Sequence, residues 1–377
     1  MTMAASTLKK IRVLIVDDSA FMRKVLETIL ITDESVQVVG HAKDGREAVR
    51  LSESLKPDVI TMDINMPVMD GLQATAEIMT TNPRPIVVVS SESRQGAAST
   101  LRALELGAIE FVAKPSSGID LDMHSVREDL LRKVRLASKV RVVRSASRIA
   151  SAITNADGKA ISSLPAPASR PAATATYDQR FPVVVLAAST GGPATVMRLA
   201  PGFTRDFPAA VILVQHMPAA FTTQYAAQLA EFTGARVKEA ENNETLTSGT
   251  FYICPGGQHL RVMNTGRIQL DGSSGRINGY LPSIDVAMES VAAFAGALSI
   301  GVILTGMGND GAAGASAIKS AGGMVLAQDE ATSVIFGMPS EAIKVGAVSQ
   351  VLGIDDIYAA IEKQVLAISR IATVGVR

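Results

Sequence analysis

Residues 11–19 read IRVLIVDDS, and this stretch decides the fold of the first part of the chain. Its first six residues are apolar except for one arginine, which predicts a buried β-strand that ends at Val16. Two aspartates and a serine follow at once, so polar residues lie at the carboxyl end of the predicted strand. The same order of apolar run and polar turn recurs further along the chain.

Nine more segments extend this pattern to about residue 135. Four apolar runs predict further strands, at 36–39, 59–62, 86–89 and 109–112. Five amphipathic stretches predict helices, near 20–31, 45–55, 71–82, 96–106 and 122–137. Strands that alternate with helices at this spacing predict right-handed crossovers and a parallel sheet with helices on both faces.

Polar residues follow four of these strands at their carboxyl ends, where open parallel sheets bind ligands. They are Asp17, Asp18, Asp63, Ser90 and Lys114. Three converging carboxylates repel one another unless a cation joins them, and hard oxygen ligands without a complete protein cage suit Mg²⁺. Lys114 and the Ser90 hydroxyl would then hold the oxygens of a phosphoryl group carried on Asp63. A purely structural role, as a helix cap or in a turn, would explain any one of these residues. It does not explain all five together.

The motifs that contain these residues resemble those of a response-regulator receiver domain. They are VDDS at 16–19, MDINMPVMDG at 62–71 and KP at 114–115, and the resemblance covers about residues 9–135. It implies a flavodoxin-like fold and phosphorylation of Asp63 by a partner histidine kinase. It also implies Mg²⁺ bound by Asp17, Asp18, Asp63 and the backbone carbonyl of Asn65.

Residues 136–179 interrupt the alternation and predict a linker. The segment is rich in Ala, Ser, Thr and Pro and cannot bury much apolar surface. Residues 132–180 contain ten Lys or Arg and two Asp, a net charge of +8. A solvated tether explains this surplus more simply than a docking surface for an acidic partner.

A second α/β block begins near residue 180 and continues to residue 377. Four apolar runs predict buried parallel strands, at 182–188, 210–215, 299–305 and 323–327. Three shorter runs predict a small antiparallel excursion, at 250–253, 259–263 and 267–270. We therefore expect a doubly wound, mainly parallel, Rossmann-like sheet.

Three strand ends of the second block carry residues of hydrolytic chemistry. Ser189 precedes two glycines at the start of a predicted helix, whose N–H groups face any developing oxyanion. His216 follows the next strand, and Asp310 follows a later one. A serine nucleophile needs a base, and the base needs a carboxylate to orient it. The chain has no G-x-S-x-G elbow, so spacing alone supports a triad and separate structural roles about equally.

A competing interpretation uses the loop at 306–311. Gly306, Gly308 and Gly311 form a G-x-G-x-x-G pattern after a strand, and Asp329 ends the next strand. This is the dinucleotide-binding fingerprint with its ribose acid. The chain would then be a phosphorylation-controlled binding module without enzymatic activity. Asp310 argues against this alternative, because a carboxylate inside the loop would repel a pyrophosphate.

The second block also resembles the catalytic domain of the CheB family. Four motifs carry the resemblance: ASTGGP at 188–193, QHM at 215–217, LTGMGNDG at 304–311 and AQDE…FGMP at 327–339. The resemblance implies a protein-glutamate methylesterase and glutamine deamidase for chemotaxis. Ser189 would be the nucleophile, His216 the general base and Asp310 its orienting acid. The Met307 N–H would contribute to the oxyanion hole, with Thr190 beside the nucleophile.

Three departures from the family pattern leave this triad intact. Ala188 stands where Gly is usual, Tyr280-Leu281 where a His-Arg pair is common, and Ser340 where Arg is usual. The resemblance implies methyl-accepting chemoreceptors as substrates. We expect a receiver domain at 9–135, a linker at 136–179 and a catalytic domain at 180–377. We also expect the unphosphorylated receiver to cover the catalytic crevice.

Composition narrows the remaining classes of function. Lys plus Arg and Asp plus Glu each number 36, so the net charge of zero gives no whole-chain attraction to nucleic acid or anionic membranes. The second block shows no helix-turn-helix, and no apolar stretch is long enough to insert into a membrane. One cysteine, Cys254, excludes an intramolecular disulfide. These features and the absence of a secretory signal predict a cytoplasmic protein.

Overall fold

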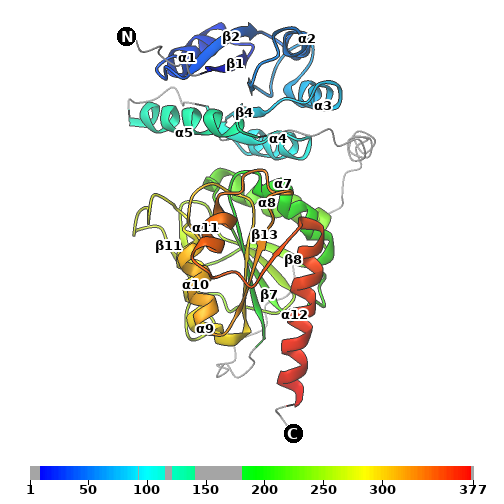
Figure 1. Cartoon of the computed structure of the whole chain (residues 1–377), viewed down its shortest axis with the longest axis vertical. Helices are drawn as coiled ribbons and strands as arrows, with labels where there is room; N and C mark the ends of the chain where they lie inside the picture. The colour runs from blue at the N-terminus through cyan, green and yellow to red at the C-terminus, as the bar shows by residue number, and fades with distance from the viewer. Residues whose placement is uncertain (1–8, 92, 115–120, 141–180, 375–377) are drawn as a thin grey trace, which may run out of the picture.

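The computed structural model describes residues 9–91, 93–114, 121–140 and 181–374. Two α/β blocks are stacked one above the other (Figure 1). Residues 141–179 of the predicted linker lie outside the described residues. None of the helices in the described ranges combines the length and apolar character that a membrane crossing requires.

The first block is a five-stranded parallel sheet covered by helices. Its sheet order is β2-β1-β3-β4-β5, the order of a flavodoxin-like fold. Its strands are β1 (Ile11–Val16), β2 (Val36–Ala42), β3 (Val59–Met62), β4 (Ile86–Ser90) and β5 (Glu110–Ala113). Its helices are α1 (Ala20–Leu30), α2 (Gly45–Leu55), α3 (Gly71–Thr81), α4 (Arg94–Glu105) and α5 (Leu121–Ala137).

Side-chain alternation along β1 explains why helices cover both faces of this sheet. Val13 and Ile15 pack into one hydrophobic cluster, and Leu14 and Val16 pack into another. All four side chains are buried, as expected for a central parallel strand. Helices α1 to α4 begin at side-chain caps, including a complete capping box at Asp70 before α3.

The second block contains a seven-stranded sheet in which all neighbouring strands are parallel. Its order is β14-β13-β12-β6-β7-β9-β8. The strands are β6 (Val183–Ala188), β7 (Ala210–Gln215), β8 (Arg236–Glu239), β9 (Thr250–Ile253), β12 (Ser299–Ile303), β13 (Met324–Gln328) and β14 (Gln350–Leu352). The helices are α7 (Gly192–Leu199), α8 (Ala219–Phe232), α9 (Ile284–Ala295), α10 (Ala312–Ser320), α11 (Met338–Lys344) and α12 (Ile354–Val374).

The antiparallel excursion is smaller than the sequence predicts. Among the strands of the described residues, β10 (His259–Val262) and β11 (Ile268–Asp271) form the one antiparallel pair. The strand predicted at residues 250–253 is present, but its assignment to the antiparallel excursion was wrong, because β9 lies between β7 and β8 in the parallel sheet. All four of its residues are buried, which suits a strand inside a covered parallel sheet.

The two blocks meet where α4 of the first faces α7 and α8 of the second (Figure 1). Residues of β5 also contact the second block. The ring of Phe111 on β5 lies against the ring of Phe221 on α8, with centroids 4.4 Å apart. Gln228 of α8 donates a hydrogen bond to Glu105 at the end of α4. The helix α12 extends away from this interface (Figure 1).

Candidate active site

An acidic pocket lies at the carboxyl edge of the first sheet. The chain crosses from β1 to neighbours on opposite sides, β2 and β3, which makes this edge a topological switch point. Carboxylate oxygens of Asp17, Asp18 and Asp63 lie within 4.8 Å of one another. Lys114, which follows β5, places its Nζ 2.9 Å from Asp17 Oδ2 and 2.9 Å from Asp63 Oδ2.

The charge balance of this pocket fits a divalent cation. Burial raises the pKa of Asp63, although the hydrogen bond from Lys114 opposes that shift. Burial by itself would lower the pKa of Lys114, but its bonds to Asp63 and Asp17 raise it, so the amine stays protonated. The formal charges of three carboxylates and one ammonium sum to −2. Hard oxygen donors with this charge are suited to Mg²⁺.

The other residues predicted for this pocket lie on its border. Ser90 is buried at the end of β4, and its hydroxyl donates to the Gly96 carbonyl of α4 at 3.3 Å. The backbone N–H of Lys114 donates to the Ser90 carbonyl at 2.7 Å, which ties the ends of β4 and β5 together. Asn65 is exposed in the loop between β3 and α3.

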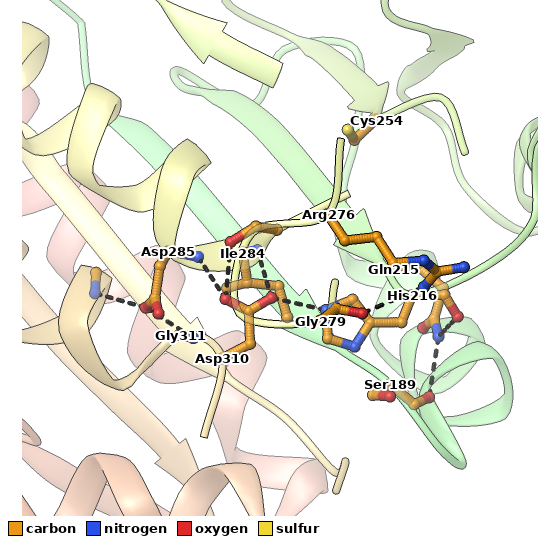
Figure 2. A network of polar contacts seen from close by, with 12 residues as sticks. Ser189, Gln215, His216, Cys254, Arg276, Gly279, Ile284, Asp285, Asp310 and Gly311 are labelled. Carbon is orange, nitrogen blue, oxygen red and sulfur yellow. Dashed lines mark hydrogen bonds and ion pairs between the residues drawn. The ribbon is translucent and has the colours of Figure 1, made fainter. Parts of the chain in front are cut away.

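The second sheet has its switch point between β6 and β12, and the predicted catalytic residues lie there. Ser189 follows β6, His216 follows β7 and Asp310 follows β12. Backbone bonds hold two of these positions: the Ser189 N–H donates to the Thr305 carbonyl, and the His216 N–H donates to the Ala188 carbonyl, each at 3.1 Å. Figure 2 shows the three side chains directed toward one another.

Asp310 is buried and saturated with hydrogen-bond donors. His216 Nε2 lies 2.8 Å from its Oδ2, and the Ser283 hydroxyl donates to its Oδ1 at 3.0 Å. The N–H groups of Ile284 and Asp285, in the first turn of α9, donate to it at 2.7 and 2.9 Å. Burial by itself would raise the pKa of Asp310, but these bonds hold that pKa below its usual value. The carboxylate is therefore ionised when it faces His216.

The second ring nitrogen of His216 is available for a proton. Nδ1 is buried and accepts no hydrogen bond from any described residue. This edge of the ring faces Ser189 in Figure 2. Because Nε2 faces a carboxylate, the neutral ring carries its hydrogen on Nε2 and a lone pair on Nδ1. The ring of Tyr280 is stacked on the imidazole, with centroids 4.4 Å apart and planes inclined by 16°.

Thr190 and Met307 flank the site. The Thr190 hydroxyl donates to Glu110 Oε2 of the first block at 2.9 Å. Met307 is 41% exposed in the loop after β12. The preceding carbonyl, that of Gly306, accepts the N–H of Met338 at 2.8 Å, so the start of α11 holds this loop in place.

Sequence reasoning missed three residues that support the site. Gln215 donates from Nε2 to the Ser189 carbonyl at 2.9 Å. Ser283 binds Asp310, and Tyr280 is stacked on His216. The position of Gln215 at the end of β7 was a usable signal. The other two lie just before α9, where no strand end marks them, and only the folded chain brings them to the site.

The dinucleotide alternative is not favoured by this geometry. The Asp310 carboxylate binds the start of α9, and a Cβ atom at Gly308 would lie 2.0 Å from the Tyr280 hydroxyl. The space over the glycine loop is therefore occupied by a side chain. Asp329 accepts the N–H and the hydroxyl of Thr332, at 2.9 and 2.6 Å, which makes it a turn-forming residue.

The fold and its two strand-end sites define a class of protein: a receiver-type α/β domain joined to a parallel α/β domain of hydrolase type. Comparison with known proteins agrees for both parts. The family model for the response regulator receiver domain matches residues 13–125. The family model for the CheB methylesterase matches residues 184–361.

Relatives match nearly the whole chain. A protein-glutamate methylesterase/protein-glutamine glutaminase of Symbiobacterium thermophilum is 41% identical, over 95% of this chain and 98% of the relative. One from Pyrococcus horikoshii is 39% identical, over 95% of this chain and 94% of the relative. The solved catalytic domain of Thermotoga maritima CheB methylesterase is 38% identical and covers 49% of this chain and 99% of its own, with a TM-score of 0.47.

The chain belongs to the CheB methylesterase family, in the form that carries a receiver domain. The predicted fold class and the predicted enzyme class, a carboxylic ester hydrolase, are confirmed.

Proposed function

We propose that this chain hydrolyses glutamyl methyl esters, and the side-chain amides of glutamines, on methyl-accepting chemoreceptor proteins. One observation carries the catalytic assignment: His216 is held by Asp310 through Nε2, while its unpartnered Nδ1 faces Ser189. This arrangement supplies a nucleophile, a base and an acid that orients the base.

The reaction begins when Ser189 Oγ attacks the γ-carbonyl carbon of the ester and His216 Nδ1 takes the hydroxyl proton. The carbonyl oxygen becomes an oxyanion, which the Met307 N–H and the N-terminus of α7 stabilise. His216 then returns the proton to the departing methanol, and an acyl-serine remains. Water attacks the acyl-serine with His216 again as base, and glutamate and free Ser189 result. A glutamine substrate follows the same steps and releases ammonia.

The acidic pocket of the receiver domain takes a phosphoryl group on Asp63 from a partner histidine kinase. Mg²⁺ bound by Asp17, Asp18, Asp63 and the Asn65 carbonyl would neutralise charge on the incoming phosphoryl oxygens. Lys114 already contacts two of these carboxylates, so phosphorylation of Asp63 gives its ammonium a new partner. The Ser90 hydroxyl, at the neighbouring strand end, would bind another phosphoryl oxygen.

The strand β5 links this pocket to the hydrolase. Its first residue, Glu110, accepts the hydrogen bond from Thr190, directly beside the nucleophile. The next residue, Phe111, contacts Phe221, and Lys114 follows the strand. In the unphosphorylated state the receiver therefore covers the catalytic crevice. Phosphorylation shifts the equilibrium toward the released state, because it changes what Lys114 contacts at one end of β5.

The test of the catalytic assignment is Ser189→Ala. We expect the variant to keep its fold and to release no methanol from a methylated receptor, because no oxygen nucleophile remains. Labelling by a serine-reactive fluorophosphonate should disappear with it, and circular dichroism provides the fold control. Turnover near the wild-type rate in this variant would remove Ser189 from the mechanism.

A further inference from the structure

Tyr280 lies between the two halves of the proposed catalytic machinery. Its ring is stacked on His216 at a centroid distance of 4.4 Å, with the planes nearly parallel at 16°. Its hydroxyl fills the space beside Gly308, where a Cβ atom would lie 2.0 Å from the oxygen. One side chain therefore packs against both the general base and the loop that carries Met307.

The backbone around Tyr280 is held in place. Its N–H donates to the Ile277 carbonyl at 2.9 Å, and its carbonyl accepts the N–H of Ile277 at 3.0 Å. Three residues later, Ser283 binds Asp310, so the segment is fixed on both sides of the ring. The side chain is half-buried. Because its backbone is fixed, the Tyr280 ring can restrict the movement of the His216 imidazole.

A single hydrogen bond to Asp310 leaves the orientation of the His216 ring incompletely determined. The bond fixes one ring edge, while the ring can still tilt about the bond and turn Nδ1 away from Ser189. A flat stacking partner removes that freedom, because tilting would drive the imidazole into the Tyr280 ring. Aromatic faces also attract cations, and the imidazole becomes a cation when it takes the serine proton.

Burial raises the pKa of Tyr280, and the nearby Asp310 carboxylate raises it further. The phenol therefore stays neutral over the physiological range, and its ring keeps the same electrostatic character throughout the reaction.

We infer that Tyr280 is a positioning residue for His216: it fixes the plane of the imidazole so that Nδ1 faces Ser189, and it stabilises the imidazolium formed during the reaction. This inference rests on the proposed function, because it assumes that His216 is the base. The aromatic ring carries the effect, and the hydroxyl is dispensable.

The experiment compares Tyr280→Leu and Tyr280→Phe in the full chain, with acetyl phosphate as phosphodonor. We measure kcat and KM for methanol release from a methylated receptor fragment, and the rate of fluorophosphonate labelling. The leucine variant should lose about 5- to 30-fold in kcat and in labelling rate, while KM stays within about twofold. The phenylalanine variant should remain within about twofold of wild type, because it keeps the ring.

Several results would overturn the inference. The first is a Tyr280→Leu variant with the kcat of wild type. The second is a Tyr280→Leu variant with a raised KM and an unchanged kcat. The third is a decrease of kcat in Tyr280→Phe as large as that in Tyr280→Leu. A raised KM would make Tyr280 a substrate contact, and an equal loss would assign the effect to the hydroxyl. The stimulation by acetyl phosphate should be unchanged in both variants, and a changed ratio would assign the effect to domain docking.

Two controls keep the outcome decisive. If the leucine variant fails to fold, Tyr280→Met replaces it, since methionine keeps a long apolar side chain without a ring, and the same loss is expected. Ser189→Ala sets the background rate. If the wild type released methanol no faster than Ser189→Ala, the proposed function itself would fail. The Tyr280 variants are compared only with an active wild type, so the two failures can be distinguished.

Discussion

Asp310 and Asp285 are two buried carboxylates that cap each other's helices. Asp310, just before α10, accepts N–H groups from the first turn of α9. Asp285, in that first turn, accepts the N–H groups of Gly311 and Gly314 at 2.8 Å each. Burial raises the pKa of Asp285, and the neighbouring Asp310 charge adds to the shift. The pair thus keeps the negative charge on the carboxylate that faces His216.

This arrangement gives a prediction about pH and stability. Because the pKa of Asp285 is raised on folding, the native state binds its proton more tightly than the unfolded state does. The associated stability is fully present below the ordinary carboxyl pKa of about 4 and is lost as pH rises through the native value. Asp285→Asn keeps an acceptor oxygen and cannot ionise. The melting temperature of Asp285→Asn minus that of wild type should therefore increase as pH is raised from about 4 to about 7.5.

Thermal melts followed by circular dichroism at several pH values test this prediction. The control is Asp271→Asn, at the last residue of β11, where hydrogen bonds from Ser274 and Ser273 lower the pKa of the carboxyl group. Its melting temperature relative to wild type should not rise over the same range. A relative melting temperature of Asp285→Asn that falls with pH would show that ionised Asp285 stabilises the protein through its two N–H partners.

At the level of elements, the position of Ser189, the proposed nucleophile, depends on how closely α7 approaches the sheet. Gly192 is the first residue of α7, and a Cβ atom there would lie 2.1 Å from Gln215 Oε1 and 2.8 Å from Ala188 Cβ. The same Gln215 holds the Ser189 carbonyl. A side chain at residue 192 would therefore move α7 or displace Gln215, and either change disturbs the turn that carries Ser189.

We predict that Gly192→Ala destabilises the protein by about 1–3 kcal/mol, as overpacking of a close-packed interior does. Fluorophosphonate labelling should slow as well, because the Ser189 turn shifts. The matched control is Gly234→Ala, where the nearest atom to a Cβ is 3.6 Å away and little change is expected. Urea unfolding measures the stability, and equal stabilities for the two variants would contradict the prediction.

The elements differ in how far the sequence alone predicts them. Apolar runs such as that of β1 identify buried strands, and caps such as Asp70 mark where helices begin. The edge strands β8 and β14 carry no comparable run, since they read RVKE and QVL and are mostly outside the core. The place of β9 in the parallel sheet follows from pairing with β7, which lies two strands earlier in the chain, and with β8, whose sequence has no apolar run, so local pattern could not reveal it.

On the scale of the whole molecule, β5 lies between the proposed phosphorylation site and the proposed catalytic serine. The strand carries an interface acid and an interface aromatic residue, Glu110 and Phe111, and leads directly to Lys114 in the acidic pocket. The candidate site residues were predictable because polar residues follow buried strands. The contact between Glu110 and Thr190 was not, because it depends on how two separately folded blocks dock.

The docking contact gives a prediction about basal activity. Glu110→Ala removes the acceptor for the Thr190 hydroxyl, so the docked state should weaken and the crevice should open more often. We expect the unphosphorylated rate of methanol release to rise about 2- to 10-fold, and the stimulation by phosphodonor to shrink in proportion. Glu53→Ala, on the exposed face of α2, is the control. An unchanged basal rate in Glu110→Ala would show that this contact does not restrain the hydrolase.

The most direct test of the whole proposal is methanol release from a methylated chemoreceptor by the full chain, with and without acetyl phosphate and Mg²⁺. Wild type should release methanol, and release should accelerate when the phosphodonor and metal are both present. Ser189→Ala should release none, and Asp63→Asn should keep only the basal rate. Methanol release that persists in Ser189→Ala, or that responds equally to the phosphodonor in Asp63→Asn, would contradict the assignment of these two sites.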